Sequence, residues 1–156
     1  MTARASATGR LAQLREASER CLAEFEAAPA ERRDALLERL RLALELRWKI
    51  EEQLVIPALG KREASLLLPA AERESNHLRD LAAHGARDAM SSVAGLAALR
   101  AERIELALAA AQKRRGFDGS ALLRDIDALL ERWRGEVRRT GDIEDEESDP
   151  VGLPPR

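Results

Sequence analysis

Apolar residues recur at helical spacing along most of the 156-residue chain. In the first such segment Leu11, Leu14, Leu22 and Phe25 fall on one face of a helix, as a period of about 3.6 residues requires. We expect helices over residues 8–28 and 31–59, a third helical segment that begins past Pro69 and runs to about residue 114, and a last helix over residues 120–139. The pattern predicts a protein of long helices without a sheet.

Turn-forming residues mark the connections between these segments. Pro29 separates the first two, and Gly60 ends the second. Gly116 precedes the last segment, for which Asp118 or Ser120 can serve as the N-cap. The connections are therefore short, and short connections favour antiparallel neighbours.

The third segment contains helix-breaking residues of its own. Gly85 and the pair Ser91 and Ser92 allow a break near 85–92, which would raise the number of helices from four to five. We expect an all-α, up-down antiparallel four-helix bundle, with a fifth helix left open. The bundle would occupy residues 1–139 as a single domain. The rest, 140–156, reads as an acidic, disordered tail.

Composition agrees with a helical bundle. Charged residues make up 35% of the chain and apolar residues 45%, whereas aromatic residues make up only 3%. Six acids and one base lie in the tail, so 22 of the 28 acidic and 25 of the 26 basic residues remain elsewhere. That balance gives no case for nucleic-acid or membrane binding. With one cysteine, Cys21, and no apolar run of about 18 residues, the chain is expected to be soluble and cytoplasmic.

One polar pair interrupts the apolar face of the second segment. In "ELRWKIEEQLVIPAL", Arg47 and Glu51 fall on the stripe that carries Leu40 and Leu44. A guanidinium and a carboxylate one turn apart can form an exposed pair that contributes about 0.2–0.5 kcal/mol. They can also belong to a buried network, in which loss of one partner costs about 3–5 kcal/mol. The position in the stripe favours the buried arrangement for Arg47.

The same stretch resembles the second helix of the haemerythrin-like HHE cation-binding family, where a His, three residues and Glu-Glu precede an apolar run ending in Pro. "LREASERCLAEFEAAP" is similar to the first helix of that family, and "EASLLLPAAERESNHLRDL" to the approach to its third-helix histidine. The resemblance covers about residues 10–85 and weakens after residue 90. It implies a four-helix bundle with a di-iron site that handles oxygen, nitric oxide or peroxide.

Most of the metal ligands that the resemblance implies are replaced in this chain. The second-helix histidine position holds Arg47, although its carboxylate partner is present as Glu51. The first-helix histidine would fall near Arg15, and the third-helix histidine matches His77. A guanidinium stays protonated and has no lone pair to offer, so Arg47 cannot ligate a cation. Beside the remaining carboxylates, it would supply the positive charge that iron supplies in the family.

A second Arg-Trp-basic-x-Glu pattern lies on the last segment. "RWRGE" places Arg132 and Glu136 at the His-x-x-x-Glu spacing of the family's fourth helix, and it repeats the "RWKIE" of the second segment. The repeat predicts that ion pairs, Arg47 with Glu51 and Arg132 with Glu136, stand in place of the metal centre. For Arg132 a buried and an exposed position stay equally open, because it projects near the edge of its apolar stripe.

The chain has only two histidines, His77 and His84, which excludes a histidine-rich site. They share a helix face, and with Glu51 they could hold one remaining cation. The alternative is a pair of partly buried, hydrogen-bonded histidines beside solvated acids. In a haemerythrin-like arrangement, His77 and Glu74 would face Arg47.

These residues favour a non-enzymatic bundle that needs no cofactor and acts as a binding or regulatory module for an unidentified protein or small molecule. Two other classes stay open: an iron-binding metalloprotein, and a structural bundle that forms homo-oligomers. Cys21 is expected to be a small core residue rather than a nucleophile, and Trp48 and Trp133 to cover the ends of the core. The acidic run 142–147 could attract divalent cations weakly, but a solvated tail is the expected state.

Overall fold

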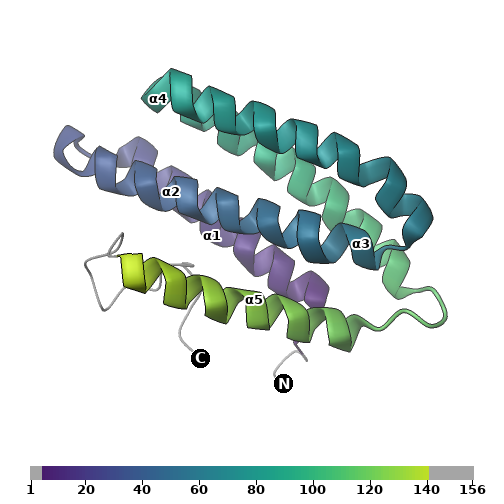
Figure 1. The fold of residues 1–156 in the computed structure, drawn as a ribbon. Coiled ribbons are helices and arrows are strands. Elements are labelled where there is room, and N and C mark those ends of the chain that lie inside the picture. The colour runs from purple at the N-terminus through teal and green to yellow at the C-terminus, as the bar shows by residue number, and fades with distance from the viewer. Residues whose placement is uncertain (1–4, 141–156) are drawn as a thin grey trace.

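The computed structural model describes residues 5–140, without the side chains of residues 85–87 and 138–140. In this part of the chain the structure is all-α and has no strand (Figure 1). Its helices are α1 (Ala7–Ala27), α2 (Ala30–Ile50), the π-helix η1 (Glu51–Val55), α3 (Ile56–Ala58), α4 (Lys61–Gln112) and α5 (Gly119–Thr140). None of these helices is both long enough and apolar enough to cross a membrane. The predicted tail lies outside the described residues, apart from the last residue of α5.

The helix boundaries follow the apolar pattern closely, with one exception. α1, the continuous stretch from α2 to α3, and α5 begin and end close to the predicted limits. The expectation that the third helix begins past Pro69 is wrong, because α4 begins at Lys61 and contains Pro69. A proline inside a helix removes the hydrogen bond to the carbonyl four residues earlier, here that of Ser65. Pro69 and Ser65 are both exposed, so water can solvate that carbonyl.

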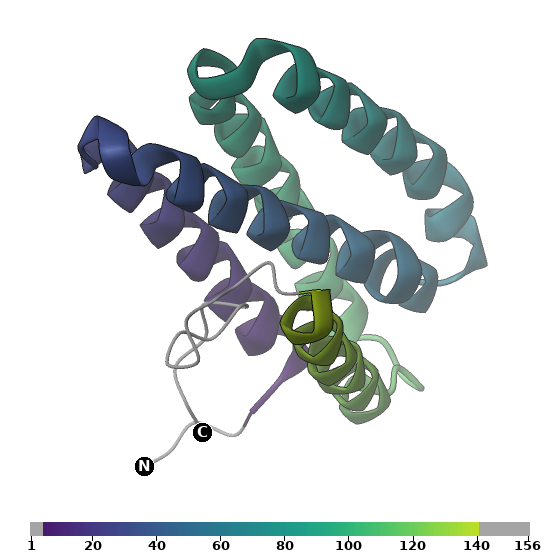
Figure 2. The same cartoon turned by 60° about the vertical axis from the view of Figure 1, so that its left-hand side comes forward.

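α4 is one helix of 52 residues by its backbone, yet it folds back on itself. Arg100 Nη1 donates to the carbonyl oxygen of Ala71 at 2.9 Å, across 29 residues. In a straight helix these residues would lie about 40 Å apart. Figures 1 and 2 show the two antiparallel stretches, which we call the first arm (residues 61–80) and the second arm (residues 93–112). The reversal lies between the arms, in the part of the chain where a break at 85–92 was left open.

α2 occupies the centre of the molecule. In both views it lies beside α1 and between the first arm of α4 and α5 (Figures 1 and 2). Its C-terminal half is accordingly buried on more than one face, at Leu42, Ala43, Leu44, Leu46, Arg47, Trp48 and Ile50. The helix then widens into η1, a π-helical turn, before α3 continues it. Single π-helical turns inside α-helices occur often at functional sites, and η1 begins at Glu51.

The apolar core consists of two clusters. One packs α5 onto α1, η1 and the ends of the α4 arms, and it includes Leu11, Ile50, Leu108, Ile126 and Leu130. The other joins the end of α1, one face of α2 and the parts of α4 near the reversal, and it includes Phe25, Leu40, Trp48, Met90 and Val93. Four buried residues of α2, η1 and the two arms are polar and belong to neither cluster: Arg47, Glu51, Ser75 and Arg100. We call these four residues the polar layer.

The start of α5 offers a test of the local structure. Asp118 Oδ1 accepts a hydrogen bond from the backbone N–H of Ala121 at 2.9 Å, so Asp118 and not Ser120 caps this helix. Asp118→Ala should lower the free energy of unfolding by about 0.5–2 kcal/mol, because one N–H of the first turn loses its acceptor. Asp118→Asn keeps an acceptor at the same place and should cost less. Equal urea midpoints for Asp118→Ala and the unchanged chain would contradict this role.

Candidate functional site

Glu51 is the centre of the polar layer. Its side chain has an exposed fraction of 0%, and those of Arg47 and Arg100 on either side have 4% and 3%. Arg47 Nε donates to Glu51 Oε2 at 2.8 Å, and Arg100 Nε lies 3.0 Å from Glu51 Oε1. One carboxylate therefore faces two guanidinium groups, one from α2 and one from the second arm of α4.

Burial and neighbouring charges have opposing effects on the pKa of the Glu51 carboxyl. Burial raises the pKa of the Glu51 carboxyl, and the positive charges of Arg47 and Arg100 act to lower it. The neighbouring carboxylate of Glu52 adds a smaller upward effect on the same pKa. Without the two arginines, a carboxylate in this position would bind a proton rather than stay charged in the core.

Arg47 ties this centre to α1 and to the second arm. Its Nη1 donates to the carbonyl oxygen of Leu11, and its Nη2 lies 3.9 Å from Glu105 Oε1. Arg15 Nε donates to the other oxygen of Glu105 at 3.0 Å, while Arg15 Nη1 donates to Glu19 at 3.2 Å. Charges of alternating sign thus run from the surface of α1 to the buried Arg47.

Arg100 ties the centre to the first arm of α4. Its Nη1 donates to the carbonyl oxygen of Ala71 at 2.9 Å and to Ser75 Oγ at 2.6 Å. Its Nη2 lies 4.0 Å from Glu52 Oε2 in η1. The guanidinium of Arg100 therefore connects the two arms of α4 by hydrogen bonds at the level of Glu51.

Several atoms of this network form ion pairs without aligned hydrogen bonds. Arg47 Nη2, Glu51 Oε1, two nitrogens of Arg100 and Glu105 Oε1 are buried without a hydrogen-bond partner among the described residues. Each still lies within 4.0 Å of an opposite charge. Guanidinium groups do not release protons in proteins. With Glu51 enclosed as well, the arrangement suits charge compensation rather than acid–base chemistry.

The side chain of Arg47 is buried, as its position in the apolar stripe of the second segment predicts. The partners expected from the third segment are not there. Glu74 pairs with Arg103 at 3.1 Å on the surface of α4, and His77 is exposed. Glu51, Glu105 and the Leu11 carbonyl satisfy Arg47 in their place. The rotation of the first arm decides this, because it turns Ser75 rather than His77 toward the network.

The residues suggested for a single remaining cation do not meet. His77 and His84 are both exposed on α4, whereas Glu51 is fully buried. The ring Nδ1 of His84 lies 2.9 Å from the carbonyl oxygen of Asp80, one turn earlier in the same helix. In the described part of the chain, no group of three or more His, Cys, Asp or Glu side chains is arranged to hold a metal ion.

The repeat on α5 does not enter the buried network either. Arg132 and Glu136 are both exposed, and the second arginine beside Glu51 is Arg100. The sequence also contains a pattern that predicts a buried Arg100, although Arg100 is not among the site residues expected above. Arg100 follows Ala97 by three residues and precedes Ile104 by four, so it lies in an apolar stripe as Arg47 does.

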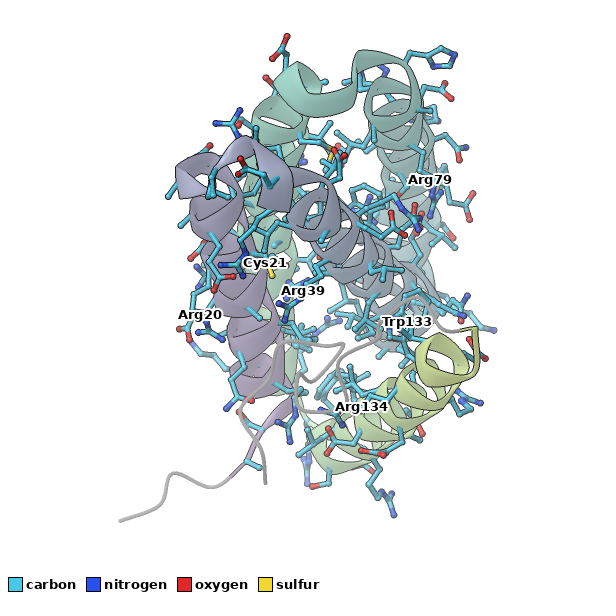
Figure 3. All side chains as sticks on the ribbon, turned by 90° about the vertical axis from the view of Figure 1, so that its left-hand side faces the viewer. Arg20, Cys21, Arg39, Arg79, Trp133 and Arg134 are labelled. Carbon is cyan, nitrogen blue, oxygen red and sulfur yellow. The ribbon has the colours of Figure 1, made fainter. Side chains whose placement is uncertain are left out.

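The remaining singled-out residues are core or edge positions. Cys21 is half-buried against the cluster that contains Phe25, and Figure 3 shows it on the side of α1 near Arg39. Burial raises the pKa of the Cys21 thiol, which keeps it protonated and poorly nucleophilic. Trp48 is buried within the same cluster rather than at an end of the core. Trp133 is partly buried at the edge of the other cluster.

Comparisons with known proteins do not add an assignment. No protein-family model, no curated protein and no solved structure matches this chain. A functional inference for this chain therefore rests on the chemistry of the site itself. That chemistry is a buried carboxylate held between two guanidinium groups.

Proposed function

We propose that this chain is a haemerythrin-like four-helix bundle without a metal centre, which acts as a non-enzymatic binding or regulatory module. One observation carries the proposal. Glu51, which stands at the family's second-helix carboxylate position, is enclosed by the guanidinium groups of Arg47 and Arg100. A cation at Glu51 would have to displace both, and like charges so close together in a buried site repel strongly.

The origin of the network's members supports the bundle part of the proposal. Four helical stretches contribute to it: α1 through Arg15, α2 with η1 through Arg47 and Glu51, and the two arms of α4. Bundles of this kind build their metal and cofactor sites from side chains on facing helices. In this proposal α5 is the additional helix, and it packs against one end of the bundle.

The residue types at the former ligand positions support the metal-free part. Arg47 and Arg15 stand where the resemblance expects histidines, and both belong to the network around Glu51 and Glu105. An arginine offers donors only, so it neutralises a carboxylate but cannot complete a coordination sphere. The iron-binding alternative would need other ligands to replace these side chains.

Metal analysis tests the proposal directly. Protein expressed in iron-replete medium should purify without stoichiometric iron and without the absorption of an oxo-bridged di-iron centre. Arg47→His should not gain iron, because Arg100 would still pair with Glu51 and Arg15 with Glu105. The variant should also be less stable. Arg103→His, an exposed substitution on α4, is the matched control and should leave stability nearly unchanged.

Close to two irons per chain would overturn the proposal and support the alternative, an iron protein that handles oxygen, nitric oxide or peroxide. Iron bound by Arg47→His but not by the unchanged chain would mean that the other ligands are already in place. That result would also contradict the account of Arg100 as a permanent partner of Glu51.

A further inference from the structure

The repeated "RWKIE" and "RWRGE" stretches meet in space at a surface cleft. The cleft has a volume of about 220 Å³ and is lined by Lys49, Gln53, Leu129, Arg132, Trp133 and Glu136. Arg47 and Glu51 point into the core, but Lys49 projects from the other side of α2 toward α5. Its ammonium nitrogen lies 5.5 Å from the centre of the Trp133 ring. Figure 3 shows Trp133 in the space between α2 and α5.

The cationic groups of this cleft are not held by carboxylates, unlike several arginines elsewhere on the protein. Arg15, Arg79, Arg103 and Arg114 each pair with a carboxylate. Lys49 and Arg132 have no carboxylate partner within 4.0 Å in the described part of the chain. Both converge on one cleft from different helices, and only Glu136 contributes a negative charge to its lining. The lining charge is therefore +1.

We propose that this cleft binds a small aromatic monocarboxylate. Its carboxylate would lie between Lys49 and Arg132, where the planar guanidinium can donate two parallel hydrogen bonds to it. The amide of Gln53 supplies a further donor at the same rim. A single negative charge complements the lining charge of +1, whereas a phosphate dianion would exceed it and approach Glu136.

The apolar part of the cleft indicates the body of the ligand. Leu129 and the Trp133 ring form its wall, and both belong to the core region around α5. The indole N–H of Trp133 is buried and has no hydrogen-bond acceptor among the described residues, so the nitrogen lies behind the lining of the cleft rather than at its surface. Drug-sized ligands occupy about 300–1,000 Å³, and a cleft of about 220 Å³ suits a smaller molecule with one ring.

This inference rests on the proposed function, because it names a ligand class for the binding module. Phenylacetate is a suitable probe, and its neutral isostere phenylacetamide is the matched control ligand. The chain contains two tryptophans, so proton–nitrogen correlation spectra resolve two indole N–H signals, one from Trp133 beside the cleft and one from Trp48 in the core. Titration of the full chain with phenylacetate should shift the Trp133 signal saturably and leave that of Trp48 in place.

Substitutions separate specific binding from general attraction of an anion. Arg132→Gln should weaken phenylacetate binding at least about tenfold, because it removes a charged hydrogen-bond donor. Arg103→Gln removes the same charge from the surface of α4 and should leave the affinity unchanged. Both positions are exposed, so both variants should fold.

Three results would overturn the inference: no saturable shift at Trp133, equal affinity for phenylacetamide, or equal affinity in Arg132→Gln. The metal content of the protein is measured independently of these titrations. Iron in the purified chain would count against the proposed function but not against the cleft. A metal-free chain that does not bind phenylacetate would contradict the proposed ligand site in the cleft but not the proposed function.

Discussion

Glu51→Leu should lower the free energy of unfolding by about 3–5 kcal/mol, the largest effect that we expect from any single substitution in the polar layer. The change removes the carboxylate that faces both Arg47 and Arg100 and leaves two buried guanidinium groups without their shared counter-charge. Urea unfolding followed by circular dichroism measures the effect as a shift in midpoint at constant slope.

The matched control replaces all members of the charged centre together. Arg47→Met, Glu51→Leu and Arg100→Met in one chain should restore most of the lost stability or exceed the original, because the three most deeply buried charges are then removed together and Arg15 still pairs with Glu105. Apolar replacement of a complete buried ion-pair network is often neutral, or stabilising by about 1–4 kcal/mol. If Glu51→Leu alone had a midpoint like that of the unchanged chain, Glu51 could not be held as the structure indicates.

Leu108→Ala should cost about 2–5 kcal/mol, because it opens a cavity where α5 packs onto the second arm of α4. Leu108 has an exposed fraction of 0% and belongs to the cluster that contains Leu11, Ile126 and Leu130. Calorimetry or urea unfolding of the purified variant measures the loss. The same experiment tests whether α5 is an integral part of the fold.

Leu106→Ala is the control for this experiment. It makes the same chemical change two residues earlier in the same helix, where the leucine is 73% exposed. Its effect should stay within about 0.5 kcal/mol. Similar losses of stability in the two variants would mean that the second arm is rotated differently from the structure. The buried position of Arg100, which lies on the same arm, would then also be wrong.

Two copies of one sequence pattern have different environments in the structure, and they meet at the cleft between α2 and α5. "RWKIE" and "RWRGE" share residue types and spacing, which suggested that both form ion pairs, with the burial of Arg132 left open. Only the first pair is buried, because α2 is covered on several sides, whereas Arg132 and Glu136 lie on the exposed side of α5. What the two stretches have in common in the structure is the contact of Lys49 with Trp133.

The sequence by itself determined the elements of this protein and the character of their faces. Helical spacing and turn residues predicted α1, the α2–α3 stretch and α5 closely, because these depend on local backbone and side-chain chemistry. The same spacing placed Arg47 on the apolar side of its helix. Such a statement needs no knowledge of the neighbouring helix, since one helix carries the whole stripe.

Only the tertiary structure decided which faces meet. Arg100 and Ser75 come together because α4 reverses, and this contact spans 25 residues that a straight helix would hold far apart. A helical period predicts that a side chain points inward, but it does not predict the rotation or height of the helix opposite. For that reason His77 lies outside the network and Arg100 inside it, although the resemblance to the haemerythrin-like family implied the histidine.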